Sequence, residues 1–324
     1  MNPAGPGTID PSESEARSVW TILAKALSLV VIVGIGFGMK RLRWVKAEDF
    51  SMLSKIVLRV TLPCALATSF NQFEIVPSLL GLTLLAFLAN IAQQAVGYVQ
   101  QRRGTPVQKA FGILHGGSYN IGAFALPYLS AFIGPAAIVY ASLFDVGNSL
   151  ATAGVGRSAA HAVARPEVKQ TLPSIAKLLF TSPVFDTYLA LVLMRLLHIQ
   201  LPSVIIGFTS LVGAANPFLA MFMIGVGLEV GLPRHRLSTA IRGLITRYLF
   251  SITIATLVWF FLPFARDVKV VVVLVLFAPI AAMVPGFTSE IDGHVGTATF
   301  MNSVTILIAI VMMPALYLIL SAYV

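Results

Sequence analysis

The sequence has few charged residues and a single cysteine. Asp, Glu, Lys and Arg make up 11% of its 324 residues, whereas hydrophobic residues make up 57%. No soluble domain of this size needs that ratio, so the composition predicts a polytopic membrane protein. The one cysteine, Cys64, excludes an internal disulfide framework and a cysteine-based metal site.

The sequence also lacks the short motifs that mark common enzymes. It has no HExxH, CxxC, Walker loop or nucleophile elbow. The GIGFG run at 34–38 lies within a hydrophobic segment, so it predicts close helix packing rather than nucleotide binding. We therefore expect a protein that is not an enzyme and holds no metal or resident cofactor.

Long hydrophobic runs recur along the chain, and each is long enough to cross a bilayer as a helix of about 20 residues. Residues 1–19 are polar and acidic and lack the basic start of a signal peptide, so we expect a disordered, retained tail. The pattern predicts an all-α protein with ten transmembrane helices, at 20–39, 50–70, 76–99, 107–131, 135–156, 174–197, 203–230, 239–262, 268–287 and 294–321.

The basic residues predict an orientation. The net charge is +9, but the charges cluster in short loops between spans, which argues against a nucleic-acid partner. One set of loops carries fifteen Lys and Arg, with Arg234, Arg236, Arg242 and Arg247 among them, and the other set with both tails carries four. Loops rich in Lys and Arg favour the cytoplasmic side, so the set with fifteen is expected in the cytoplasm. Both termini then lie outside the plasma membrane, which agrees with an even number of spans.

Prolines suggest an internal repeat. Pro63 and Pro217 are 154 residues apart, and Pro127 and Pro285 are 158 apart. The offsets predict two five-helix repeats, and because five is odd the second enters the membrane inverted, as in many transporters. Prolines are common in membrane helices, so chance agreement is the alternative. The predicted units are repeats at 20–156 and 174–324, joined by a basic cytoplasmic loop at 157–173.

The fourth and ninth spans, 107–131 and 268–287, are predicted to be broken and to cross. A proline removes a backbone donor and frees a carbonyl, and such groups are tolerated only inside protein or along a wet cavity. Opposed half-helix ends then offer partial charge to an ion or substrate. The residues expected at the breaks are Gly122, Pro127, Pro279, Pro285 and Gly286.

Polar residues inside spans are the candidate site residues. Asp145 has Asn148 one turn later, and this mid-span carboxyl could carry a proton, bind sodium or make a structural hydrogen bond. Arg59 could hold a substrate carboxylate, pair with Asp186 or extend to the membrane surface. Glu290 could face a cavity or lie in a loop.

Several motifs, in order, resemble the auxin efflux carrier family, which includes PIN-type auxin exporters and bacterial organic-acid carriers. Residues 120–127, NIGAFALP, resemble the family's N-x-G-x-x-G-x-P element, with Ala125 in place of the second glycine. FDVGNS at 144–149 resembles its fifth-helix motif, and the run from Pro285 through Glu290 to Pro314 resembles its last two helices. The resemblance covers residues 25–321.

The resemblance implies a fold and a mechanism. The spans at 20–39, 50–70, 174–197 and 203–230 would form a scaffold that makes a homodimer. The other six would move as a transport unit and carry an organic anion, such as a malate-like, malonate-like or auxin-like acid. Asn120 would contact the substrate carboxylate, with Ser118 and Tyr119 as further candidates.

Two other classes of function stay open. A sodium-coupled symporter of the bile-acid type would use Asp145, Asn148, Glu290 and Asn302 as oxygen ligands. A membrane receptor or assembly protein that does not transport is the other alternative, although such a protein could fill mid-span positions with leucine.

Overall fold

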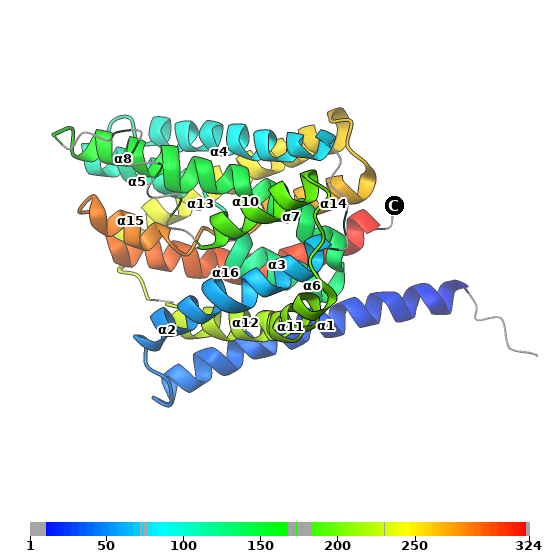
Figure 1. Cartoon of the computed structure of the whole chain (residues 1–324). Helices are drawn as coiled ribbons and strands as arrows, with labels where there is room; N and C mark the ends of the chain where they lie inside the picture. Colours follow the sequence, from blue (N-terminus) through cyan, green and yellow to red (C-terminus); the bar gives the residue numbers. More distant parts are fainter. Residues whose placement is uncertain are drawn as a thin grey trace, which may run out of the picture.

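The computed structural model describes residues 11–71, 73, 77–167, 171, 173, 176, 180, 183–229 and 231–321. Every regular element in these residues is helical (Figure 1). The helices are α1 (Pro11–Arg41), α2 (Asp49–Ile56), η1 (Val57–Thr61), α3 (Leu62–Asn71), η2 (Pro77–Leu80), α4 (Gly81–Gln100), α5 (Pro106–Gly116), η3 (Ile121–Ala125), α6 (Leu126–Phe132), α7 (Pro135–Ser149), η4 (Leu150–Gly156), α8 (Arg157–Ala164), α10 (Pro183–Leu196), α11 (Ser203–Gly213), α12 (Asn216–Gly227), α13 (Arg234–Phe261), α14 (Arg266–Leu276), α15 (Val284–Glu290) and α16 (Val295–Ser321).

Six helical stretches of the described chain are long and apolar enough to cross a membrane. They are Trp20–Arg41, Asp49–Asn71, Ser78–Gln100, Ser203–Gly227, Arg234–Phe261 and Val295–Ser321. The prediction of a helical, polytopic membrane protein is therefore confirmed.

The ends of two predicted segments differ from expectation. Helix α1 already begins at Pro11, within the predicted tail, while residues 1–10 lie outside the described residues. The predicted loop at 157–173 starts with α8, which continues directly from α7 and η4. Part of this loop, and of the predicted span at 174–197, lies outside the described residues.

The helices pack into two groups. The first helix group comprises α1, α2, α3, α10, α11 and α12, and the second comprises α4, α5, α6, α7, α8, α13, α14, α15 and α16. Figure 1 shows α4 along one side of the molecule and α1 with α12 along the opposite side. Contacts between α10 and α7, between α3 and α7 and between α12 and α6 join the groups.

Glycines let α1 and α12 approach closely within the first group. A methyl group at Gly36 would lie 2.3 Å from the carbonyl oxygen of Phe222, and one at Gly225 would lie 2.1 Å from that of Val33. No side chain fits at either position, so the two backbones touch directly, as the glycine run predicts.

Two helices of the second group are interrupted. The chain leaves its helical conformation between Gly116 and Ile121, and again between Leu276 and Val284. The N–H of Asn120 donates to the carbonyl of Pro279 at 2.8 Å, so the two interruptions meet.

The first interruption lies upstream of the expected position. Gly122 belongs to η3 and Pro127 lies in the first turn of α6, where proline is tolerated. In the second interruption, Pro279 lies within the non-helical segment, and Pro285 lies in the first turn of α15, followed by Gly286.

Candidate functional site

A cavity of about 240 Å³ lies between the two helix groups, beside the meeting point of the interruptions. We call it the crossover cavity. Asn120, Pro285 and Asn302 line it from the second group. Phe50 and Ile224 line it from α2 and α12 of the first group. The cavity therefore brings together Asn120 of the first interruption and Asn302 of α16.

Among the polar residues of this cavity, Asn120 is the one whose side chain has the fewest hydrogen bonds. Its backbone is fixed, because its N–H donates to Pro279 and its carbonyl accepts from Ala125 at 3.1 Å. Its side chain is buried, with the residue only 5% exposed, and bonds to no other residue in the part of the chain that the structure describes. The amide atoms are not sealed off from the cavity, so a ligand or water in the cavity can bond to them. The amide can both donate and accept.

Ser118 and Tyr119 precede Asn120 but do not line the crossover cavity. The hydroxyl of Ser118 donates to the carbonyl of Leu114 at 3.2 Å, which continues the hydrogen bonding of α5. The hydroxyl of Tyr119 donates to Gln93 in α4 at 2.6 Å. The Ser118 hydroxyl thus bonds only within its own helix end, whereas Tyr119 ties the interrupted segment to α4.

Asn148 holds the first interrupted segment. Its side-chain oxygen accepts from the N–H of Tyr119 at 3.0 Å, and its Nδ2 donates to the carbonyl of Tyr119 at 2.9 Å. The second interrupted segment is held in a related way. Asn302 donates to the carbonyl of Ile280 at 2.6 Å, and the hydroxyl of Thr305 accepts from the N–H of Ile280 at 3.0 Å.

Asp145 is buried beside the crossover cavity rather than in its lining. Its Oδ1 accepts from Nδ2 of Asn148 at 2.7 Å, and its Oδ2 accepts from the hydroxyl of Tyr188 at 2.8 Å. Tyr188 belongs to α10, so this carboxyl joins the two helix groups. A methyl group added at Gly122 would lie 3.3 Å from Oδ2, so a larger residue there would crowd the carboxyl.

Arg247 is the buried charge that the sequence reasoning misplaced. It lies in α13 with only 1% of its surface exposed, so its assignment to a cytoplasmic loop is wrong. Its guanidinium donates to the carbonyls of Gly116 at 3.0 Å, Ser118 at 2.6 Å and Ala278 at 3.2 Å. The signal was present in the sequence, because the predicted span at 239–262 contains this arginine and charges within spans are rarely incidental.

Arg59 and Asp186 do not meet. Both side chains are exposed on the protein surface, and no ion pair joins them. Neither residue lines the crossover cavity. Of the three alternatives for Arg59, substrate binding in this cavity and a pair with Asp186 are therefore not formed, and the side chain is exposed.

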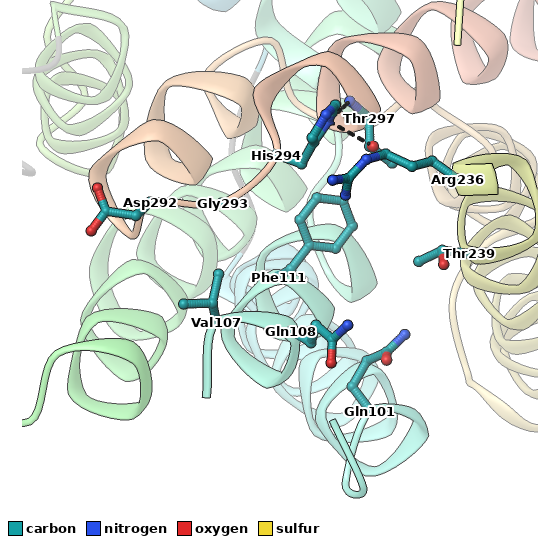
Figure 2. Close-up of a pocket in the computed structure, with 10 residues that line it drawn as sticks. All are labelled: Gln101, Val107, Gln108, Phe111, Arg236, Thr239, Asp292, Gly293, His294 and Thr297. Carbon is teal, nitrogen blue, oxygen red and sulfur yellow. Dashed lines mark hydrogen bonds between the residues drawn. The ribbon is translucent and has the colours of Figure 1, made fainter. Parts of the chain in front are cut away.

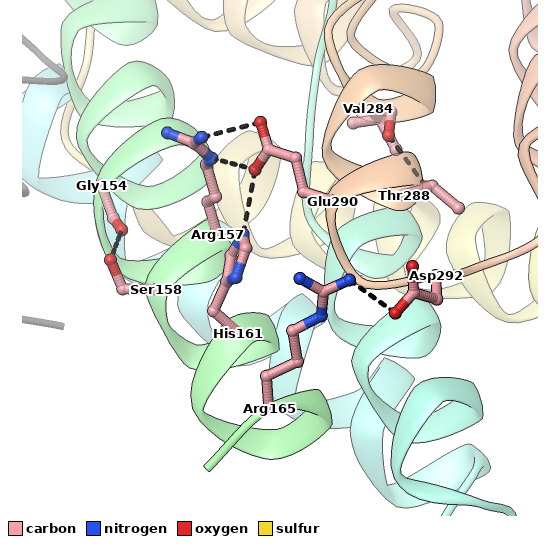
Figure 3. A network of polar contacts seen from close by, with 9 residues as sticks. All are labelled: Gly154, Arg157, Ser158, His161, Arg165, Val284, Thr288, Glu290 and Asp292. Carbon is pink, nitrogen blue, oxygen red and sulfur yellow. Dashed lines mark hydrogen bonds and ion pairs between the residues drawn. The ribbon is translucent and has the colours of Figure 1, made fainter. Parts of the chain in front are cut away.

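Glu290 is placed in an ion-pair network instead of the crossover cavity (Figure 3). Arg157 binds both of its carboxylate oxygens, at 2.6 and 2.7 Å, and Nε2 of His161 lies 2.9 Å from one of them. Burial alone would raise the pKa of Glu290, but the hydrogen bonds and charges of Arg157 and His161 outweigh it and hold that pKa below its usual value. The network connects α8 to α15, with Asp292 and Arg165 forming a second pair nearby.

Two further cavities are separate from the crossover cavity. An open pocket of about 290 Å³ lies within the second group, between Phe111, Arg236 and His294 (Figure 2). It is lined by none of the site residues predicted from the sequence. A cavity of about 210 Å³ lies between the two groups, against Ser69 and Asn216, and we call it the opposite cavity.

Comparisons with known proteins give a general class. No protein-family model matches the chain. The chain is 25% identical over 220 residues to an uncharacterized transporter of Methanothermobacter thermautotrophicus, a match that covers 66% of this chain and 70% of that protein. The chain is similar to a transporter. This likeness fits the six apolar spans, and it specifies neither substrate nor mechanism.

Proposed function

We propose that the protein is a secondary carrier that moves a small organic acid anion across the membrane, related to the auxin efflux carriers. The observation that carries the proposal is the side chain of Asn120, a buried amide that bonds to no other described residue and lines the crossover cavity. Its Nδ2 would donate to a substrate carboxylate, and Asn302 lines the same cavity. A cavity of about 240 Å³ suits a small acid.

The carrier would have ten transmembrane helices in two inverted repeats. The matching contacts at the two interruptions support this arrangement. Asn148 and Asn302, which hold the two segments, are 154 positions apart (302 minus 148), the same offset as Pro63 and Pro217. Gln93 and Arg247, which flank the segments from α4 and α13, are also 154 apart (247 minus 93).

Alternating access would come from movement of the second helix group against the first. The crossover cavity and the opposite cavity both lie between the groups. Ala47, which lines the crossover cavity, precedes the span Asp49–Asn71, and Ser69, which lines the opposite cavity, lies near its end. The two cavities thus lie toward opposite ends of this span, which supports an elevator-type movement. The first group would be the scaffold and the homodimer contact, in a plasma membrane with both termini outside.

Sodium-coupled symport is the second candidate. Asp145 and Asn148 favour it, because they place buried carboxylate and amide oxygens next to the crossover. Those oxygens already accept hydrogen bonds from Tyr119 and Tyr188. A sodium ion would have to replace these bonds. We therefore favour transport that is coupled to protons or that runs down the substrate gradient over transport coupled to sodium.

Radiolabelled flux in proteoliposomes tests the proposal. A panel of mono- and dicarboxylates would be offered under imposed sodium and proton gradients, to the wild type, Asn120→Ala and the matched control Ser118→Ala. We expect one acid to move, Asn120→Ala to lower its flux by about tenfold or more, and Ser118→Ala to transport normally. If no acid moves under any gradient, or if Asn120→Ala transports as the wild type does, the proposed function or its site is wrong.

A further inference from the structure

Arg247 is a buried cation whose hydrogen bonds in the described chain all go to backbone carbonyls. Gly116 and Ser118 contribute two carbonyls from the first interruption, and Ala278 contributes one from the second. No carboxylate lies within 4.0 Å of its guanidinium in the described chain. The ring of Tyr119 lies beneath it, with 4.7 Å between the ring centre and Cζ. The charge is therefore balanced by carbonyl dipoles and an aromatic face.

These carbonyls belong to the carboxyl ends of two half-helices. Gly116 ends α5 and Ala278 follows the end of α14 by two residues, and both helices have 11 residues. Such ends carry partial negative charge, and a convergence of carbonyl oxygens is the usual environment of a hard cation. In broken-helix transporters, unwound carbonyls and half-helix carboxyl ends commonly coordinate the coupling ion.

We propose that Arg247 is a built-in cation of the crossover, which takes the place that a bound alkali ion would otherwise fill. It neutralises the carboxyl ends of both half-helices at once and fixes the segment that presents Asn120. It does not line the crossover cavity, so it is a positioning residue. The inference deepens the proposed function. Only its flux experiment depends on that function, because the Tm measurements require no transport. It predicts that the wild-type protein needs no sodium at this position.

Arg247 also adjoins a narrow cavity that lies next to the open pocket of Figure 2. A narrow cavity of about 20 Å³ adjoins Arg247, His115 and Gln93, which is room for about one water molecule. Nε2 of His115 is buried there without a hydrogen-bond partner in the described residues. This narrow cavity shares Gln101, Phe111 and Thr239 with the open pocket of Figure 2. A shorter side chain at position 247 would extend the narrow cavity to the three carbonyls.

Arg247→Ala tests the inference by cation rescue. Purified protein would be heated in choline chloride alone and with added methylguanidinium, sodium or potassium, and flux would be measured in the same salts. We expect the wild type to be indifferent to these cations. Arg247→Ala should have a lower Tm and about tenfold less flux in choline, and methylguanidinium should restore both most fully, followed by sodium. Arg242→Ala is the matched control, since Arg242 lies in the same helix with an exposed side chain.

The outcomes separate this inference from the proposed function. If Arg247→Ala keeps the wild-type Tm in choline, or loses stability that no cation restores, the inference is wrong. If Arg247→Ala cannot be purified, Arg247→Lys is tested instead. Because this variant keeps the positive charge, its Tm should not depend on sodium. A sodium-dependent Tm of Arg247→Lys would contradict the inference. The Tm series needs no substrate, so it stands even if the wild type moves no acid.

Discussion

The hydroxyl of Tyr188 in α10 donates a hydrogen bond to the buried carboxyl of Asp145 in α7, at 2.8 Å, and this bond links the two helix groups. In an elevator-type carrier the two groups must slide past each other. The bond between Tyr188 and Asp145 would then hold the present arrangement and break during the cycle.

Tyr188→Phe should therefore change two quantities: the rate at which the helix groups exchange between their two arrangements, and the stability of the protein. Removing the hydroxyl leaves an oxygen of Asp145 without this partner, and we expect a loss of about 1–3 kcal/mol in the stability of the protein. If the protein carries an organic acid as proposed, the exchange rate of that acid should rise in Tyr188→Phe, because one link between the groups is gone. Thermal unfolding and exchange flux would measure the two effects.

Tyr140→Phe is the matched control for that variant. The hydroxyl of Tyr140 donates to Asp267 at 2.8 Å, and both residues belong to helices of the second group. We expect a lower Tm from this change with no effect on exchange. An equal effect of both variants on exchange would show that the bond between Tyr188 and Asp145 has no special part in the movement.

Acid should weaken the network around Glu290. The pKa of this carboxyl is held below its usual value, so its contribution to stability is complete above the unfolded-state pKa, near 4.5, and is lost as the pH falls through the lower folded-state value. The difference in Tm between the wild type and Glu290→Gln should thus be largest near neutral pH and shrink in acid. Glu48→Gln, which changes an exposed carboxylate, should show no such difference. A constant difference down to strongly acid pH would exclude the ion pairs as its source.

Close packing of α1 on α12 should make Gly36 intolerant of any side chain. Even Gly36→Ala places its methyl group 2.3 Å from a backbone oxygen, so one of the helices must shift, at a cost of about 1–3 kcal/mol. Gly38→Ala, in the same helix, meets nothing within 4 Å and should be neutral or stabilising. Thermal unfolding of the two variants compares them, and equal Tm values would contradict the contact.

The membrane class and the helical content could be predicted from the sequence because both depend on local composition. Hydrophobic runs of sufficient length specify spans whatever their neighbours are. The position of Asn120 next to a helix break was also accessible, because proline and glycine act on the chain near them.

Partners of the polar residues could not be predicted in the same way. Ser118 and Tyr119 are adjacent to Asn120, yet only Asn120 lines the crossover cavity, because the extended segment turns successive side chains to different sides. A count of Lys and Arg places Arg247 in a loop, because such a count ignores the depth of a residue within a helix. Its three carbonyl partners lie far away in sequence, so only the folded chain brings them together.

Equilibrium binding of the transported acid to purified protein tests the central claim most directly. The claim is that the side-chain amide of Asn120 holds the substrate carboxylate in the crossover cavity. Titration calorimetry would compare the wild type with Asn120→Ala and with Ser118→Ala, after thermal unfolding has shown that all three are folded. We predict that Asn120→Ala raises Kd by about tenfold or more while Ser118→Ala leaves it unchanged. Equal affinity of Asn120→Ala and the wild type would contradict the account.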